Sequence, residues 1–108
     1  MRPIPRSWLA SSMTWRPPVG SGLGGEFGEA ETTAPVRFEA SRSSSTSAYQ
    51  SADGPSGRVW VDARTSEGAV PPVGSLVSVD GGPEMVVASV SPYFVRGELH
   101  HTELEVRG

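Results

Sequence analysis

Cysteine is absent from this chain of 108 residues, which excludes a disulfide framework and any metal site built on thiolates. Lysine is also absent, so all nine basic residues are arginines. The codon bias of a GC-rich genome would explain this composition. A demand for bidentate arginine pairs at interfaces is the alternative explanation.

Long apolar runs are missing as well. No stretch approaches the roughly 18 apolar residues of a membrane-spanning helix, and the first residues lack the apolar segment of a signal peptide. We therefore expect a soluble protein that does not associate with membranes and is not secreted by that route. The net charge of −3 provides no general attraction to nucleic acid or to anionic membranes.

The charges that are present are unevenly distributed. Residues 1–16 contain arginines and no acidic residue, whereas residues 17–33 contain glutamates and no basic residue. A basic N-terminal arm on an acidic body is suited to docking neighbouring copies or partner proteins.

Helical periodicity is lacking, and two-residue alternation of apolar and polar residues takes its place. A chain of this length forms one domain, here residues 1–108, with one modest core. The sequence predicts an all-β fold, a small antiparallel barrel or sandwich of about six strands. The expected strands cover residues 11–16, 34–41, 58–65, 77–80, 84–91 and 100–107.

The C-terminal block, residues 73–107, has the clearest strand patterning. Asp80 and the two glycines after it favour a tight turn between the fourth and fifth strands. In the fifth strand we place Val86 and Val90 on the inward face and Val87 on the mixed face. The predicted core comprises Trp15, Phe38, Val59, Val61, Val77, Val79, Val86, Val90, Leu104 and Val106.

Three segments do not fit regular structure. Residues 1–10 contain two prolines and are expected to form an extended arm, because proline disfavours helical conformation in the residue before it. Residues 17–33 and 42–56 are rich in glycine or serine and are expected to be long flexible loops. They are either mobile insertions or loops that a neighbouring subunit orders. Their candidate contact residues are Leu23, Glu26, Phe27, Glu29, Glu31 and Tyr49.

Candidate interface residues lie in the arm and in the third strand. Alternation puts Trp60 on the outward face of that strand, together with Arg58, Asp62 and Arg64. An outward tryptophan among arginines indicates an interface, a second apolar layer or a cation–π stack within the monomer. The candidate interface residues are Arg2, Arg6, Trp8, Arg58, Trp60 and Arg64.

No catalytic or metal-binding pattern is evident. His100 and His101 are adjacent, so in a strand they are expected to point to opposite faces and not to chelate one ion together. No serine lies in a nucleophile elbow. We therefore predict that the chain is not an enzyme and has no catalytic residue, bound metal or cofactor.

Residues 74–93 read G-S-L-V-S-V-D-G-G-P-E-M-V-V-A-S-V-S-P-Y, residues 99–106 read L-H-H-T-E-L-E-V, and residues 2–9 read R-P-I-P-R-S-W-L. Together they resemble the minor capsid or head-completion proteins of long-tailed bacteriophages, the stopper proteins of the head-to-tail connector. Residues 17–56 do not contribute to this resemblance.

The resemblance implies a structural virion protein assembled in the host cytoplasm. Copies would form a homo-oligomeric ring below the portal and the portal-side adaptor, and the ring would bind a tail terminator or tail tube protein. One of the two long loops would reach the channel and retain packaged double-stranded DNA, and glutamates on that loop would keep DNA from sticking. The alternative is an SH3-like or OB-like adaptor that binds a peptide or nucleic acid, although the acidic body argues against nucleic acid.

Overall fold

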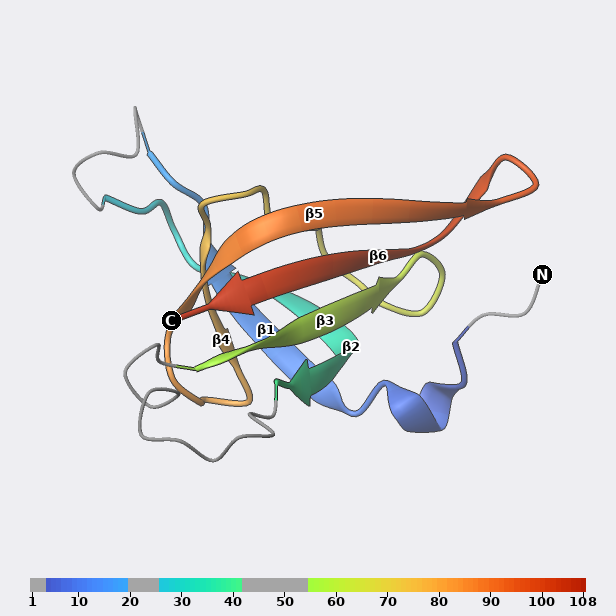
Figure 1. Ribbon diagram of the computed structural model, residues 1–108, viewed down its shortest axis with the longest axis horizontal. Coiled ribbons are helices and arrows are strands. Elements are labelled where there is room, and N and C mark those ends of the chain that lie inside the picture. The colour runs from blue at the N-terminus through green and yellow to red at the C-terminus, as the bar shows by residue number, and fades with distance from the viewer. Residues whose placement is uncertain (1–3, 20–25, 42–54) are drawn as a thin grey trace.

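The computed structural model describes residues 4–19, 26–41 and 55–108, which form a closed antiparallel barrel (Figure 1). Its elements are a 3₁₀ helix η1 (Arg6–Trp8) and the strands β1 (Ser11–Arg16), β2 (Glu31–Ala40), β3 (Ser56–Asp62), β4 (Leu76–Val79), β5 (Met85–Val95) and β6 (Glu98–Arg107). The strand order around the barrel is β1-β2-β3-β6-β5-β4, and β4 pairs with β1 to close it. The prediction of a small all-β fold is confirmed, and the fold is a barrel.

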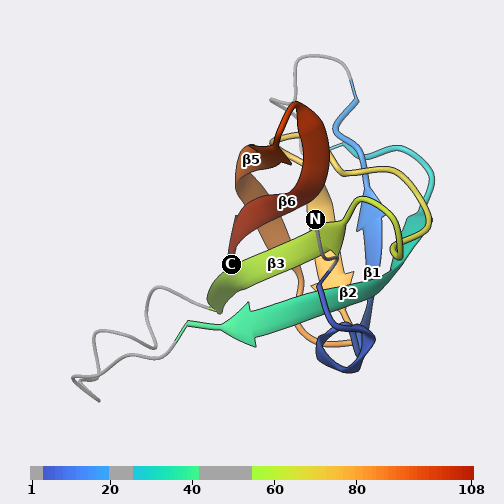
Figure 2. The same ribbon diagram turned by 90° about the vertical axis from the view of Figure 1, so that its right-hand side faces the viewer.

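The barrel is lined mainly by apolar side chains, which alternate along β1, β3, β4 and β6 but not along the whole of β2 and β5. Figure 2, which views the molecule from the hairpin side, shows β5 and β6 on one side and β1 and β2 on the other. The predicted core residues that are buried are Trp15, Val59, Val61, Val77, Val79, Leu104 and Val106. Phe38 and Val90 are half-buried and pack against this core.

The prediction for β5 is wrong at its first residues. Val86 is 39% exposed, whereas Met85 and Val87 are buried. The turn after β4 pairs Met85 with Val77, and this register turns Met85 and Val87 inward. A β-bulge between Val87 and Ser89 then shifts the register by one residue, so that Val90 packs against the core after all.

The turn between β4 and β5 has the conformation that its sequence predicts. Asp80 and Gly81 both have positive φ, at 51° and 72°, as a tight hairpin turn requires. Asp80 also joins this turn to β1, because its Oδ1 accepts a hydrogen bond from the Ser12 N–H and its own N–H donates to the Ser12 carbonyl.

The predicted loop of residues 17–33 is shorter than expected. Its last residues belong to β2, where Thr33 is fully buried and accepts a hydrogen bond from Nε1 of Trp15. Its described flanks also pair with each other, since Pro18 and Phe27 form an isolated bridge. These contacts join residues distant in the sequence, and therefore local alternation did not indicate them.

The third strand ends earlier than expected, at Asp62 rather than at residue 65. Asp62, predicted to face outward, is 1% exposed, and Ala63, predicted to face inward, is exposed. The chain turns there because the Asp62 side chain accepts hydrogen bonds from the N–H groups of Arg64 and Thr65. The connection to β4 includes Pro71 and Ser75, both of which are buried.

The N-terminal arm is only partly extended. Its described residues form a 3₁₀ turn, η1, closed by a hydrogen bond from the Trp8 N–H to the Pro5 carbonyl. Proline at the residue before this turn has the φ that a helical first turn needs, which explains why the turn begins directly after Pro5. Leu9 then enters the interior and is buried.

Strands β5 and β6 continue beyond the barrel as a two-stranded hairpin, seen at the right of Figure 1. β4 pairs with β5 only at Met85 and Val86, and β3 pairs with β6 only as far as His101. The hairpin turns at Arg96 and Gly97, which have φ of 51° and 82°. We had expected β5 to end before Pro92, yet the strand continues through it.

Pro92 lies on the open edge of this hairpin, the edge that pairs with no other strand in the described part of the chain. Pro92 pairs with Thr102 on β6. The carbonyl of His100 points toward β3, because it accepts a hydrogen bond from the Ala63 N–H just after that strand. Thr102 lies two residues further along β6, so its backbone N–H and carbonyl point to the same side as those of His100. The backbone of Thr102 therefore faces β3, and its antiparallel partner Pro92 faces away from β6. Proline is tolerated there because no ladder donor is needed on an open edge.

Candidate interface surfaces

Two tryptophans and one arginine form a stack on the outside of the barrel. The Cζ atom of Arg37 lies 5.4 Å from the ring centre of Trp8 and 5.6 Å from that of Trp60. Arg37 and Trp60 face each other in the register of β2 and β3, and η1 supplies Trp8. The outward Trp60 is thus part of a cation–π stack within the monomer, one of the alternatives that the sequence left open.

The arginine in this stack is not one of those predicted. Arg58 pairs instead with Glu103 and Glu105 on β6, at 3.4 and 3.5 Å, and Arg64 pairs with Glu98 at 3.6 Å. The partner of Trp60 is Arg37, which comes from the neighbouring strand and is visible only once the register of β2 and β3 is known. Arg58 and Arg64 therefore already have partners within the chain.

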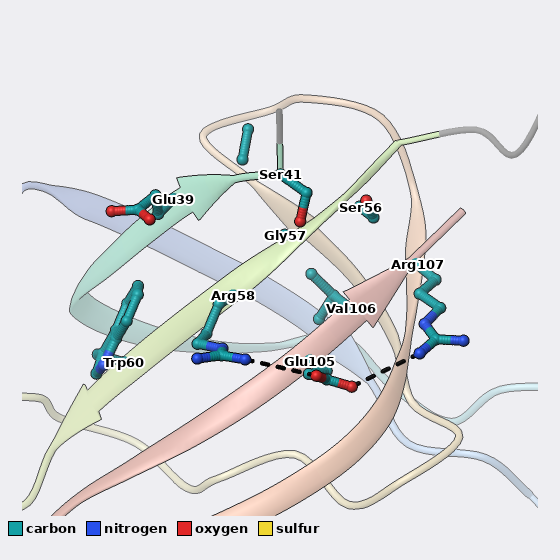
Figure 3. A pocket seen from close by; sticks show the side chains of 10 residues that line it. Glu39, Ser41, Ser56, Gly57, Arg58, Trp60, Glu105, Val106 and Arg107 are labelled. Carbon is teal, nitrogen blue, oxygen red and sulfur yellow. Dashed lines mark ion pairs between the residues drawn. The ribbon is translucent and has the colours of Figure 1, made fainter. Parts of the chain in front are cut away.

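An open groove of about 740 Å³ lies beside Trp60 on the outer face of β2, β3 and β6 (Figure 3). Its charged side chains are joined in ion pairs, with Glu105 between Arg58 and Arg107. Gly57 is required in its wall, because a Cβ there would come within 2.6 Å of the Phe38 ring. The groove is lined by Glu39, Ala40, Ser41, Ser56, Gly57, Arg58, Trp60, Glu105, Val106 and Arg107.

The end of the β5–β6 hairpin, residues 93–99, carries large apolar side chains in solvent, and we call it the hairpin tip. Phe94 is 63% exposed, and Tyr93, Val95 and Leu99 are also exposed. These residues are not among the predicted contact residues, because Pro92 suggests that the strand ends before them. A two-residue turn between apolar runs, Arg96-Gly97, was the signal that could have indicated a hairpin.

The two histidines lie at the base of this hairpin and are closer than predicted. Their Nδ1 atoms are 2.8 Å apart, although adjacent strand residues were expected to point to opposite faces. The ring of His101 stacks on Tyr93 at 4.9 Å, and its Nε2 lies 3.0 Å from the Glu103 carboxylate. In the described part of the chain, no group of three or more potential ligands is placed to hold a metal ion.

Asp62 anchors both the arm and the chain after β3. Its Oδ1 accepts a hydrogen bond from Ile4 N–H, and its Oδ2 accepts from Arg64 and Thr65 N–H groups. Burial raises the pKa of the Asp62 carboxyl, but these backbone hydrogen bonds, that of Thr65 foremost, outweigh burial and hold the pKa below its ordinary value. Asp62 is thus ionised at neutral pH and has a structural role.

The remaining predicted contact residues are placed as follows. Arg2, Leu23 and Tyr49 lie outside the described residues, and the backbone of Arg6 begins η1. Phe27 is half-buried and bridges to Pro18 within the same chain. Glu26, Glu29 and Glu31 are exposed, and whether they face a channel stays a prediction.

Replacing Arg37 with glutamine is expected to increase the exposure of both stacked tryptophans and to lower stability by about 1 kcal/mol, because the cation–π contacts and the exposed ion pair with Glu39 are lost. The change is measured as greater quenching of tryptophan fluorescence by acrylamide and as a small decrease in Tm. Arg107→Gln is the matched control, since Arg107 is an exposed arginine with one ion pair in the described part of the chain and no ring contact. Equal quenching in Arg37→Gln and wild type would contradict the stack.

The described part of the chain is thus a small all-β protein, a closed six-stranded antiparallel barrel with a projecting hairpin. Comparisons with protein-family models, with curated proteins and with solved structures found no match to this chain. Among the described segments, none is a helix with the length and hydrophobicity of a membrane span.

Proposed function

We propose that this protein is a head-to-tail stopper or head-completion subunit of a long-tailed bacteriophage. Copies form a ring below the portal and adaptor, join the head to the tail and help to retain packaged DNA. The observation that carries the proposal is the resemblance of residues 74–93 and 99–106 to that family. These residues build β4, most of β5 and most of β6.

The distribution of apolar side chains supports a function in binding. The barrel interior is filled by its own side chains, among them the fully buried Met13 and Leu104. The hairpin tip, in contrast, holds aromatic and aliphatic side chains in solvent, where a neighbouring subunit would cover them. In the proposed neck, these neighbours are further copies, the portal-side adaptor and the tail terminator or tail tube protein.

A second candidate is a peptide-binding small-barrel adaptor. It is favoured by one observation, the exposed Trp8 and the half-buried Trp60 near an open groove, because aromatic side chains along a groove recognise extended peptides. The ion pairs that already satisfy Arg58 and Arg107 weaken this candidate.

The proposal predicts a defined defect when the gene is inactivated in its phage. DNA-filled heads without tails should accumulate, and part of the packaged DNA should be lost, because the ring that closes the portal and binds the tail is missing. Electron microscopy of lysates and nuclease sensitivity of the packaged DNA measure both effects. Complementation with the wild-type gene from a plasmid is the control.

Mass spectrometry of purified particles provides the independent test. The protein should be present in complete virions in a fixed ratio to the portal protein. Normal tailed particles from the inactivated phage, or complete virions without the protein, would refute the proposed function and leave the adaptor as the better candidate.

A further inference from the structure

Among the large apolar side chains that are exposed in the described part of the chain, all except Trp8 and Val86 fall into two groups. One group is the hairpin tip, at the right of Figure 1. The other lies on the segments of residues 17–19 and 72–74, which the colours of Figure 1 locate in its left half. Val19 and Val73 on these segments are 45% and 57% exposed. The first group projects, and both carry apolar surface that the described part of the same chain does not cover.

The second group belongs to a surface made of three segments, residues 17–19, 26–29 and 72–74, which we call the loop end. The N–H of Val19 donates to the carbonyl of Glu26 at 3.1 Å, which joins the first two segments. A Cβ at Gly74 would lie 3.5 Å from Cγ of Pro18, which places the segment carrying Val73 against the first. The two exposed valines thus lie on adjoining segments.

The two ends also differ in charge. Arg96 at the turn of the hairpin is exposed and has no ion-pair partner in the described part of the chain, while Glu98 is paired with Arg64. The loop end presents the exposed carboxylates of Glu26 and Glu29. The guanidinium of Arg16, close to them, donates to the backbone carbonyls of residues 27 and 28. A positive apolar tip and an acidic apolar surface are complementary.

We propose that the hairpin tip of one copy docks on the loop end of the next copy. Such a contact joins two different surfaces, so each copy can give one tip and receive another, and repetition builds a closed ring or a filament. The inference deepens the proposed function and rests on it for the closure of the ring. It places Glu26 and Glu29 at the subunit contact rather than in the channel.

A single contact of this kind is weak. The tip offers four large apolar side chains, less than the roughly 1,200 Å² of buried surface that stable interfaces need. Dilute protein is therefore expected to be monomeric, and a ring becomes stable because every copy makes two contacts at once. The test must for this reason capture a transient contact.

The absence of cysteine makes disulfide trapping unambiguous. The double variant Val73→Cys/Val95→Cys, oxidised mildly at high protein concentration, should give a ladder of dimers, trimers and larger species on a non-reducing gel. Each single variant has only one thiol, so it cannot extend beyond a dimer and should remain mainly monomeric. The matched control is Glu84→Cys/Val95→Cys, because Glu84 is also exposed but lies outside the loop end.

A ladder from Val73→Cys/Val95→Cys that exceeds the control several-fold supports the inference. Equal ladders from both double variants, or a monomer from the first, overturn it. Charge reversal gives a second readout: Arg96→Glu should abolish the ladder in the double-cysteine background, and adding Glu26→Arg should restore it. No loss with Arg96→Glu would also overturn the inference.

The trapping result and the phage result are separable. A neck defect in the inactivated phage without trapping between tip and loop end would overturn this interface and leave the proposed function intact. Trapping with the purified protein supports the interface. If the protein were then absent from complete virions, the stopper function alone would be refuted. Circular dichroism of each cysteine variant verifies that the barrel is folded.

Discussion

Val87→Asp is expected to unfold the barrel, whereas Val86→Asp should leave it folded. Val87 is 1% exposed, so aspartate there would bring a charge without a partner into the apolar interior. Val87→Asp is expected to lower the free energy of unfolding by more than about 4 kcal/mol, which is a large part of the stability of a small domain. Val86 faces solvent and pairs across the strands with Arg107, so its replacement should cost about 1 kcal/mol or less.

Circular dichroism and thermal unfolding of the two variants measure this difference. The pair serves as its own control, because the substitutions are identical and adjacent. If Val86→Asp were the variant that unfolds, the inward face of β5 and the bulge after Val87 would both be misplaced.

Asp62→Ala is expected to destabilise the protein by about 3 kcal/mol, since the N–H groups of Ile4, Arg64 and Thr65 lose their acceptor. The corresponding decrease in Tm is about 10–20 °C for a domain of this size. Asp62→Asn should be intermediate, because the amide keeps one acceptor oxygen but no charge. Glu84→Gln, a change at an exposed acid, is the control and should have little effect.

The same carboxylate gives a pH dependence with a defined sign. Because the pKa of Asp62 is lower in the folded than in the unfolded protein, its ionised form stabilises the fold. This contribution is complete above the unfolded pKa of about 3.9 and is lost as the pH falls through the lower folded value. The difference in stability between wild type and Asp62→Asn should therefore be constant near neutral pH and shrink below about pH 4. A difference that is the same at pH 7 and pH 2.5 would contradict the structural role of the charge.

The sequence predicted the strands well where local chemistry determines them. Asp80 and Gly81 can adopt positive φ, and the strands on either side of them alternate, so the β4–β5 hairpin followed from a few residues. Trp15 and Leu104 were placed correctly for the same reason, since only one face of each strand is apolar. Composition was a less exact guide to the glycine- and serine-rich segments, because residues 31–33 of the first belong to β2 and Ser56 of the second begins β3. Residues 42–54 of the second segment lie outside the described residues.

The errors occur where residues distant in the sequence decide. Met85, Val86 and Val87 are all apolar, so alternation could not show which of them faces inward, and pairing with β4 settles it. Asp62 accepts hydrogen bonds from the turn that follows it, which is local, and from Ile4 N–H of the arm, which is 58 residues away and which alternation could not indicate. Arg37 became a candidate only when β2 and β3 were paired.

The candidate surfaces were predicted less well than the fold. Trp60 was predicted to lie on the outward face of its strand, and Trp8 was named as a candidate interface residue, but their association through Arg37 was not foreseen. The hairpin tip was missed because proline usually ends a strand, and an open edge is the exception. The hairpin tip thus depends on the continuation of β5 through Pro92, which only the pairing of β5 with β6 reveals.

Pro92 has one more consequence for how this molecule can meet others. An unpaired edge strand normally exposes N–H and carbonyl groups with which strands of other chains can pair, and such pairing leads to aggregation. Here a proline removes one donor from that edge, next to the exposed apolar side chains of the hairpin tip. The hairpin can therefore present apolar side chains for recognition, while the proline disfavours the addition of further strands to its backbone.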